Sequence, residues 1–511
     1  MIKKALISVW DKEGVLELAE FLVKNEVEII STGGTAKHLV ENSIPVTKIS
    51  KITGMDSVMN GRVKTLNPKI FGGILADRDN EEHLKDLSDL GAPTIDLIVV
   101  NLYPFVEEAV KKELPMKKAI EYIDIGGPSM LRAAAKNYHS VCVLSDVSDY
   151  SEFINKFDEE KKDIDLDWRK VNASKVFLRT SKYDSDIFNY FNRDNNENLP
   201  KAHSISLIKK QDLRYGENPH QSGAFYTEAN QSLDWTQYQG KDLSYNNYMD
   251  LQSAFDIVNE FKQPSCAIIK HSNPCGFATG SNLVEAYKRS VSCDPISYFG
   301  GIVSFNKEVC KNLSEKLIEP FLECIIAPSF SKDALEVLKK KKNLRVIALH
   351  SNYKKNKFEM RSTSGGYLVQ ESDSFVQDNF DKFRIVTDIK PSDAIIESLK
   401  LGWRIVRFVK SNAIVIANKN QILGVGAGQM SRVDSVKIAI RKIKEFGLSL
   451  DGAIMASDAF FPFSDSLELA SEFGIKSVIQ PGGSRNDSEV IETANKLGMS
   501  MVFTSVRHFY H

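Results

Sequence analysis

The sequence predicts an α/β protein, and three observations carry that prediction. The first ~150 residues alternate short apolar runs with segments whose apolar residues recur at helical spacing, a pattern typical of a parallel sheet with helices on both faces. The 511 residues suffice for two to four domains, at roughly 100–200 residues each. The apolar fraction of 42% and charged fraction of 26% are close to the averages for globular proteins.

The elements of the first domain follow from their apolar patterns. Apolar runs predict strands at residues 5–9, 27–30, 95–100 and 141–144. Between the first two strands, Val15, Leu18, Ala19 and Leu22 recur at the spacing of one helix face. A second helix is predicted over residues 36–40. A third opens at Gly126-Gly127-Pro128, with Pro128 at its first position, where the missing N–H removes no hydrogen bond.

Near residue 200 the composition changes. Residues 158–163 form a charge run, and residues 193–198 are polar and turn-forming. Such stretches are typical of domain boundaries, and we expect one domain over residues 1–200 and another over residues 201–511. The second domain is predicted to be mixed α/β in at least two lobes. Its C-terminal part contains a predicted hairpin (413–417 with 421–425), strands (453–456 and 476–479) and helices (465–472 and 488–497).

Composition also argues against several classes of protein. The 66 basic and 67 acidic residues leave a net charge of −1, without the basic surplus of nucleic-acid-binding proteins. There is no apolar stretch near the ~18 residues of a membrane span, and the N-terminal residues lack a signal-peptide pattern. We therefore expect a cytoplasmic protein that binds neither nucleic acid nor membranes. The six cysteines contain no Cys-x-x-Cys pair, so neither a zinc knuckle nor a redox motif is predicted.

One candidate pocket lies in the first domain. Thr32-Gly33-Gly34-Thr35 stands between a predicted strand and a predicted helix, where free backbone N–H groups favour an anion. Arg62-Val63-Lys64-Thr65 adds two cations, and Asn101-Leu102-Tyr103-Pro104 follows the strand over 95–100. Loops at the C-terminal ends of parallel strands converge on one crevice. The sequence thus predicts a cationic pocket for a phosphorylated small molecule. The glycine spacing is not that of an ATP-hydrolysing P-loop.

A second candidate site lies in the other domain. The apolar run 266–269 leads into Lys270 and His271, which precede a turn at Asn273-Pro274. A neutral imidazole is a natural general base at pH 7, and an ammonium can stabilise an oxyanion; a plain surface Lys–His pair is the alternative. The loop 214–221 is dense in polar groups and lacks apolar periodicity, which favours a binding role. Residues 424–428 do not complete the dinucleotide-binding fingerprint.

Together these motifs resemble one family, the bifunctional purine-biosynthesis enzymes that join AICAR formyltransferase to IMP cyclohydrolase. The resemblance follows the order of the family along the whole chain, as far as Arg507–His511. The other segments that carry it are Ser31–Thr35, Gly61–Leu66, Asn101–Phe105, Asp124–Gly127, Arg132–Asn137, Leu213–Gln221, Lys270–His271, Gly426–Arg432 and Ser457–Phe463.

The resemblance implies a fold and a chemistry. The cyclohydrolase is expected to be a methylglyoxal-synthase-like parallel-sheet domain, followed by two cytidine-deaminase-like α/β lobes that carry the formyltransferase. These lobes are expected to lack zinc, since Pro274-Cys275 is not followed by the second cysteine of Pro-Cys-x-x-Cys. The formyl group would pass from 10-formyltetrahydrofolate to the 5-amino group of AICAR, and the product FAICAR would close to IMP with loss of water. The resemblance implies neither nicotinamide nor ATP, and a homodimer that shares its formyltransferase site.

It also implies roles for individual residues. His271 would take the proton from the AICAR amine, and Lys270 would stabilise the tetrahedral oxyanion. In ring closure Lys136 would donate and accept the proton, with Lys64, Tyr103 and Asp124 around the reacting carbonyl. The cyclohydrolase nucleotide would be held by Ser8, Lys12, Thr32, Gly33, Gly34, Thr35, Arg62, Thr65, Asn101, Gly126 and Gly127. The formyltransferase nucleotide would be held by Arg214, Tyr215, His220, Asn412, Arg432, Phe460 and Arg507, and the folate by Val433, Asp465, Gly482 and Gly483.

The chain departs from the family pattern at two positions. The first strand of family members commonly ends Ser-x-Ser-Asp-Lys, whereas this chain has Trp10 in place of the second serine, which removes one hydroxyl near the phosphate. Some members carry an acidic residue at the position where this chain has Gly301. No nucleotide contact is therefore expected from this position.

Three other functions explain the sequence less completely than the family resemblance does. A ligand-sensing module leaves some 300 residues unexplained, a nucleoside deaminase lacks its zinc ligands, and a scaffold leaves Lys270-His271 unexplained.

Overall fold

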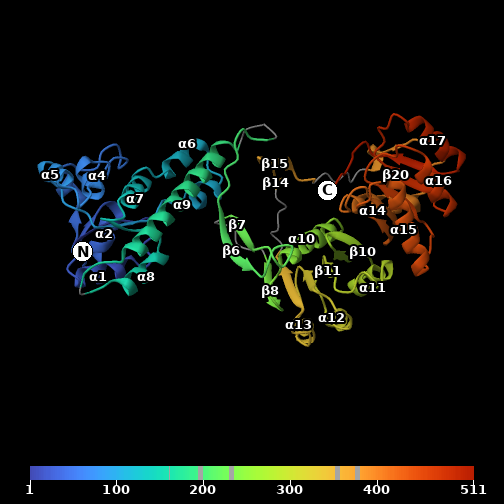
Figure 1. Cartoon of the computed structure of the whole chain (residues 1–511), viewed down its shortest axis with the longest axis horizontal. Coiled ribbons are helices and arrows are strands. Elements are labelled where there is room, and N and C mark those ends of the chain that lie inside the picture. The colour runs from blue at the N-terminus through green and yellow to red at the C-terminus, as the bar shows by residue number, and fades with distance from the viewer. Residues whose placement is uncertain (160, 194–198, 229–234, 351–356, 374–379) are drawn as a thin grey trace. The chain divides into compact units, whose positions relative to one another are not determined.

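The computed structural model describes residues 1–159, 161–193, 199–228, 235–350, 357–373 and 380–511. They form two compact units, Met1–Ser206 and Leu207–His511 (Figure 1). Within the polar run 193–198, from which a boundary was predicted, residues 194–198 lie outside the described residues.

The strands of the first unit form one parallel sheet, as predicted. Their order is β3-β2-β1-β4-β5 and each neighbouring pair is parallel. The strands are β1 (Lys4–Ser8), β2 (Glu28–Ser31), β3 (Thr47–Lys48), β4 (Leu97–Val100) and β5 (Cys142–Leu144). The two-residue strand β3 was not predicted, because it is too short to give a periodic pattern.

Helices cover both faces of this sheet. Alternate strand residues point to opposite faces: Ile7 and Val99 belong to the apolar cluster on one face, and Leu6 and Ile98 to that on the other. The helices are α1 (Val15–Lys24), α2 (Gly33–Glu41), α3 (Ile49–Thr53), α4 (Pro68–Leu75), α5 (Glu81–Asp89), α6 (Met116–Ala119), α7 (Gly126–Lys136), α8 (Ser148–Lys156) and α9 (Leu166–Phe191). The unit also has a π-helix, η1 (Val106–Val110), and a 3-10 helix, η2 (Ile120–Tyr122).

The start of α7 differs from the prediction. The helix begins at Gly126, so Pro128 is its third residue and not its first. Proline is still tolerated there, because the N–H groups of the first turn have no intrahelical acceptor. The extra turn brings the amides of Gly126 and Gly127 to the helix start.

The second unit contains two lobes. In the first, β10-β9-β11-β12-β13-β8 form a mixed sheet in which β11, β12 and β13 are parallel. Its strands are β8 (Trp235–Gln239), β9 (Ser265–Lys270), β10 (Asn273–Thr279), β11 (Ile302–Phe305), β12 (Cys324–Ala327) and β13 (Arg345–Leu349). Its helices are α10 (Tyr245–Asn259), α11 (Leu283–Cys293), α12 (Lys311–Leu317) and α13 (Lys332–Leu338).

The second lobe repeats this arrangement. Its sheet reads β18-β17-β19-β20-β21-β16, with β19, β20 and β21 parallel and β17 antiparallel to both neighbours. Its strands are β16 (Arg384–Ile385), β17 (Ile414–Ala417), β18 (Ile422–Gly426), β19 (Ile454–Ser457), β20 (Ser477–Gln480) and β21 (Ser500–Phe503). Its helices are α14 (Asp393–Val406), α15 (Arg432–Phe446), α16 (Asp465–Glu472) and α17 (Asp487–Lys496), with the turn η3 (Phe380–Lys382).

One apolar core joins the two lobes. It includes Leu251 and Phe255 from α10 together with Leu399 and Trp403 from α14. The edge strands β10 and β18 meet as well, since Thr279 N donates to Asn420 O at 2.7 Å. Two further hairpins complete the unit: β6 (Leu207–Leu213) with β7 (Gly223–Glu228), and β14 (Phe358–Thr363) with β15 (Gly366–Glu371).

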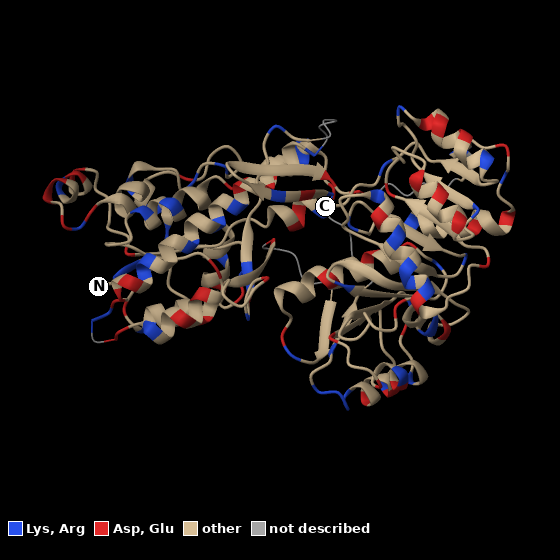
Figure 2. Ribbon diagram, turned by 45° about the vertical axis from the view of Figure 1, so that its right-hand side comes forward, with Lys and Arg blue, Asp and Glu red and all other residues tan. Residues whose placement is uncertain are grey.

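Charged residues of both signs are interspersed over the ribbon (Figure 2). Within the described residues, no helix is both long and apolar enough to cross a membrane.

Candidate active sites

A cavity of about 530 Å³ opens at the C-terminal edge of the parallel sheet in the first unit. Thr32 at the N-terminus of α2 and Gly33 line it, and Lys64 reaches it from another loop. A side chain at Gly33 would lie 3.4 Å from Lys64 Nζ. Burial lowers the pKa of the nearby Lys12, and the charge of Lys64 lowers it further although Asp11 opposes both effects. The Lys64 ammonium and the N-terminus of α2 therefore face one cavity, which suits a phosphate, and Lys12 lies near enough to Lys64 to feel its charge.

Two of the predicted binding residues shape the loop after β1. The Thr35 hydroxyl donates to Val9 O at 2.9 Å and accepts from Val9 N at 3.1 Å. Asn101 Oδ1 accepts from Asp11 N at 3.1 Å, and its Nδ2 donates to Asp11 O at 3.0 Å. Both side chains thus hold the loop that carries Lys12. Ser8, another predicted binding residue, is the last residue of β1 and directly precedes this loop.

Lys64, Tyr103 and Asp124 lie close enough to affect one another. Burial raises the pKa of Asp124, while the Gly127 amide, which donates to its Oδ1 at 2.9 Å, and the charge of Lys64 oppose that rise. Burial, and then the charge of Asp124, raise the pKa of Tyr103. A carboxyl with a raised pKa beside an ammonium and a phenol is a candidate for proton transfer.

Gly126 and Gly127 leave the space that this group needs. A side chain at Gly126 would lie 2.7 Å from Thr65 Oγ1, and one at Gly127 would lie 2.3 Å from Asp124 Oδ2. The structure therefore places the start of α7 beside Thr65 and Asp124.

Two residues predicted for the cyclohydrolase site have exposed side chains. Arg62 forms an exposed ion pair with Glu121. Lys136 is the exposed last residue of α7, ten positions after Gly126 and therefore about 15 Å along the helix axis. The proton-transfer role of Lys136 stays a prediction.

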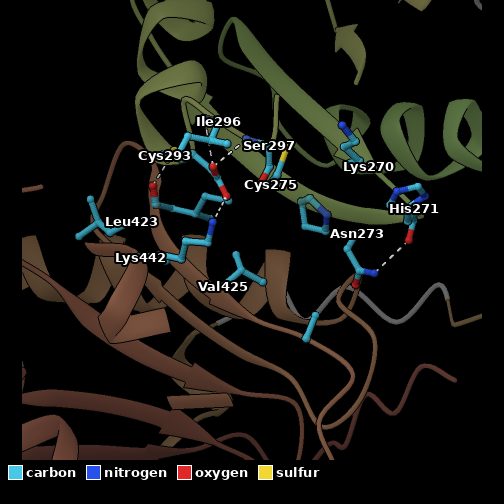
Figure 3. A pocket seen from close by; sticks show the side chains of 15 residues that line it. Lys270, His271, Asn273, Cys275, Cys293, Ile296, Ser297, Leu423, Val425 and Lys442 are labelled. Atoms are coloured by element: carbon cyan, nitrogen blue, oxygen red, sulfur yellow. Dashed lines mark hydrogen bonds and ion pairs between the residues drawn. The ribbon is translucent and has the colours of Figure 1, made fainter. Parts of the chain in front are cut away.

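In the second unit, Lys270 and His271 lie at the end of β9, where a cavity of about 490 Å³ opens between the two lobes (Figure 3). Lys270 Nζ donates to Phe299 O, and the His271 side chain is exposed. On the far side of the cavity Lys442 and Asp294 form an ion pair at 2.9 Å. Asn273 Oδ1 accepts from Lys410 N at 3.0 Å and so ties the turn to the second lobe.

Arg432 is the centre of a buried polar cluster in the second lobe. It pairs with the fully buried Asp458, and its guanidinium also donates to Ser457 Oγ at 3.0 Å and to Asn412 Oδ1 at 2.9 Å. Asp458 in turn accepts from Ser411 Oγ. Two of the predicted nucleotide-binding residues, Asn412 and Arg432, are therefore held together.

The predicted folate residues share one edge of the second sheet. Val433 is in the first turn of α15, after β18, and Asp465 begins α16, after β19. Gly482 and Gly483 follow β20 with φ of 72° and 95°. Because β18, β19 and β20 run in the same direction, their C-terminal ends lie at the same edge of the sheet, where ligands of such sheets commonly bind.

The remaining predicted nucleotide residues lie on exposed segments. Arg214, Tyr215 and His220 are in the loop between β6 and β7, where the Arg214 guanidinium lies 5.5 Å from the Tyr215 ring. Phe460 is 37% exposed and follows Asp458 by two residues. The Arg507 guanidinium lies 4.3 Å from the Phe509 ring.

Sequence reasoning missed the partners of these residues. Asp458 lies within the segment Ser457–Phe463, but the motif does not indicate its partner, because its pairing with Arg432 joins residues 26 positions apart. Asp250, whose carboxylate accepts from Ser272 N, had no signal of its own. Within the described residues, no group of three or more His, Cys, Asp or Glu side chains could hold a metal ion.

Comparison with known proteins decides the family. Residues 134–442 match the family model described as AICARFT/IMPCHase bienzyme, and residues 14–129 match the MGS-like domain. The proteins named bifunctional purine biosynthesis protein PurH of Clostridium botulinum (strain Loch Maree / Type A3) and Clostridium acetobutylicum are each 47% identical over 514 residues, which cover 100% of this chain and of each relative. The chain belongs to this bienzyme family. It is a bifunctional enzyme of purine biosynthesis, with AICAR formyltransferase and IMP cyclohydrolase activities for the last two steps.

A relative from another genus matches over its full length as well. The PurH protein of Caldicellulosiruptor saccharolyticus is 47% identical over 519 residues, again with 100% of both chains covered. Among solved structures, one titled crystal structure of ForH covers 38% of this chain and 100% of its own, at 30% identity and a TM-score of 0.35. The full-length relatives carry the family assignment.

Proposed function

We propose that Met1–Ser206 closes the ring of FAICAR and that Leu207–His511 transfers the formyl group from 10-formyltetrahydrofolate to AICAR. Two observations support this division. The MGS-like match lies wholly within the first unit, and each unit has its own cluster of proton-transfer side chains. Lys64, Tyr103 and Asp124 are in one, and Lys270 and His271 are in the other.

In ring closure, the carboxamide nitrogen of FAICAR attacks the formyl carbon, a C–N bond forms and water leaves. Both reacting groups belong to one molecule, so much of the catalysis is positioning. The N-terminus of α2 with Lys12 would hold the phosphate, through Thr32, Gly33 and Gly34. Asp124, whose pKa burial raises, would exchange the proton, while Lys64 and Tyr103 would stabilise charge on the carbonyl oxygen.

In formyl transfer, the AICAR amine attacks the formyl carbon of the folate. His271 would take the amine proton, and the Lys270 ammonium would stabilise the oxyanion of the tetrahedral intermediate. The nucleotide would be held by Arg214, Tyr215, His220, Asn412, Arg432, Phe460 and Arg507. The folate would contact Val433, Asp465, Gly482 and Gly483.

We further propose a cytoplasmic homodimer whose formyltransferase site is shared between subunits. Sharing between subunits is what the family resemblance implies; within one chain, Lys270 and His271 are in the first lobe and Asn412 and Arg432 are in the second. A shared site predicts that formyl transfer falls on dilution to monomers and that ring closure does not.

The observation that carries the assignment of ring closure is the close group of Lys64, Tyr103 and Asp124, in which Lys64 also lines the cavity at the start of α2. The test supplies the purified protein with AICAR and 10-formyltetrahydrofolate and follows tetrahydrofolate and IMP by absorbance. Equal amounts of both products are expected. Tetrahydrofolate with accumulating FAICAR would contradict the assignment of ring closure to this pocket.

A further inference from the structure

The turn that presents His271 has an unusual backbone. Lys270 pairs with Asn273 across the β9–β10 hairpin, so the loop consists of His271 and Ser272 alone. Their φ angles are +52° and +60°. Two-residue hairpin loops with positive φ at both positions strongly favour Asn and Gly, because other side chains disfavour the left-handed region. Neither residue here is of that kind, so other contacts must hold the turn.

Asp250 supplies those contacts from α10. One carboxylate oxygen, Oδ1, accepts from Ser272 N at 2.7 Å and from Ser272 Oγ at 3.3 Å. Burial raises the pKa of Asp250, and the hydrogen bonds from Ser272, together with the charge and backbone amide of His271, oppose that rise. Asn273 completes the clamp, because its Nδ2 donates to His271 O at 3.0 Å.

The position of Asp250 in its helix has no local explanation. It is the sixth residue of α10, whereas the N-terminus of that helix is capped by Ser244 and Asn247 in a capping box. Aspartate is a poor residue for a helix interior. The adjacent Leu251 and Ala254 lie in the core that joins the lobes, so the helix that bears Asp250 is firmly placed.

We propose that Asp250 is a positioning residue for formyl transfer: its carboxylate holds the left-handed His271–Ser272 turn and thereby fixes the imidazole of His271. The inference rests on the proposed role of His271 as the base. Without the acceptor, the turn relaxes toward ordinary backbone conformations and the imidazole leaves its productive place. Because substrate binding involves many other residues, kcat falls and KM changes little.

The test compares four variants of the full-length protein. Asp250→Ala removes the acceptor and is expected to lower kcat for formyl transfer about 10- to 100-fold, as misplacement of a catalytic group by about 1 Å does. Asp250→Asn retains an oxygen acceptor and is expected to stay within about threefold of the wild type. Asp256→Ala, which removes an exposed partner of Gln252 on the same helix, is the matched control. Ring closure of supplied FAICAR by each protein reports folding.

The fourth variant tests the backbone argument directly. Glycine adopts the left-handed region without a steric penalty, so adding Ser272→Gly to Asp250→Ala is expected to recover at least about tenfold of the lost kcat, because the turn no longer needs its clamp.

Three outcomes would overturn the proposal: wild-type kcat in Asp250→Ala, an Asp250→Asn protein as impaired as Asp250→Ala, or no recovery in the double variant. His271→Ala separates this failure from that of the proposed function, because formyl transfer that survives His271→Ala refutes the base itself.

Discussion

The indole ring of Trp10 packs against the phenol ring of Tyr103, with the ring centroids 4.8 Å apart and the planes inclined by 51°. The Trp10 amide also donates to Asn101 Oδ1, which joins the loop after β1 to the loop after β4. Trp10 stands where the resembling family commonly has a serine. In this chain, an aromatic contact with a candidate catalytic residue replaces the lost hydroxyl.

This contact predicts that the aromatic ring of Trp10 supports ring closure. Trp10→Phe retains an aromatic partner for Tyr103 and should stay within about threefold of the wild-type kcat. Trp10→Ala frees the phenol, and since an aromatic pair contributes about 0.5–1.5 kcal/mol, kcat should fall by up to about tenfold. Steady-state assays on FAICAR measure both, with formyl transfer as the unaffected control. Equal rates for wild type and Trp10→Ala would show that the contact is incidental.

The lack of a side chain at Gly127 predicts a larger loss of ring-closure activity on substitution than that expected for Trp10→Ala. A methyl group there would lie 2.3 Å from Asp124 Oδ2 and 3.2 Å from Leu102 Cδ2, so Gly127→Ala must displace the carboxylate. Displacement of a proton-transfer group by about 1 Å should reduce ring closure about 100-fold. Gly72→Ala in α4, whose added methyl meets its nearest neighbour at 3.4 Å, is the matched control and should be fully active. A normal rate of ring closure in Gly127→Ala would show that catalysis does not depend on the position of Asp124.

The raised pKa of Asp124 predicts that this carboxyl lowers the stability of the folded protein at higher pH, although ring closure needs it. Burial raises the pKa of this carboxyl above its unfolded value. The folded state therefore binds more protons than the unfolded state between the two pKa values, and ionisation of Asp124 costs stability as the pH rises through that interval. Asp124→Asn removes this cost and should lose ring closure.

Thermal unfolding at several pH values between 4 and 8 measures the effect. The Tm of Asp124→Asn minus that of the wild type should grow with pH and then level off. A difference that shrinks as the pH rises would reverse the sign of the argument.

The buried pair of Arg432 and Asp458 predicts a large effect on stability. Asp458→Ala leaves a buried guanidinium without its counter-charge, which costs about 3–5 kcal/mol, and formyl transfer should be lost with it. Asp434→Ala, on the same helix as Arg432, removes an exposed pair with Lys437 and should cost at most about 1 kcal/mol. Denaturant unfolding compares the two variants. Similar costs for both would mean that the buried pair is not a structural centre.

Much of the fold could be predicted from local patterns. Strands buried on both faces, such as β4, are continuous apolar runs, and helix α16 spans the residues that its periodicity predicted. The likeness of the two lobes could be expected only from the family resemblance, because the sequence shows no fixed-period repeat; the structure gives both lobes the same strand order. The hairpin of β14 and β15 was missed because its residues are largely exposed and give no clean alternation.

The candidate sites were less predictable. The sequence motifs indicated which loops carry candidate site residues, because glycines and hydroxyl side chains after a predicted strand can be recognised from the sequence. They did not show that Thr35 and Asn101 bind the backbone of the neighbouring loop. Nor could they assign Asp250 to Ser272, 22 positions away. Such partners depend on how distant elements pack, which local sequence does not encode.

Two single variants together test whether two independent active sites act in sequence. From AICAR and 10-formyltetrahydrofolate, Lys64→Ala should release tetrahydrofolate and accumulate FAICAR. His271→Ala should form no tetrahydrofolate but convert supplied FAICAR to IMP. A mixture of the two proteins should restore IMP from AICAR, because each supplies the step that the other lacks. Loss of both activities in either variant, in a protein that remains folded, would contradict the account.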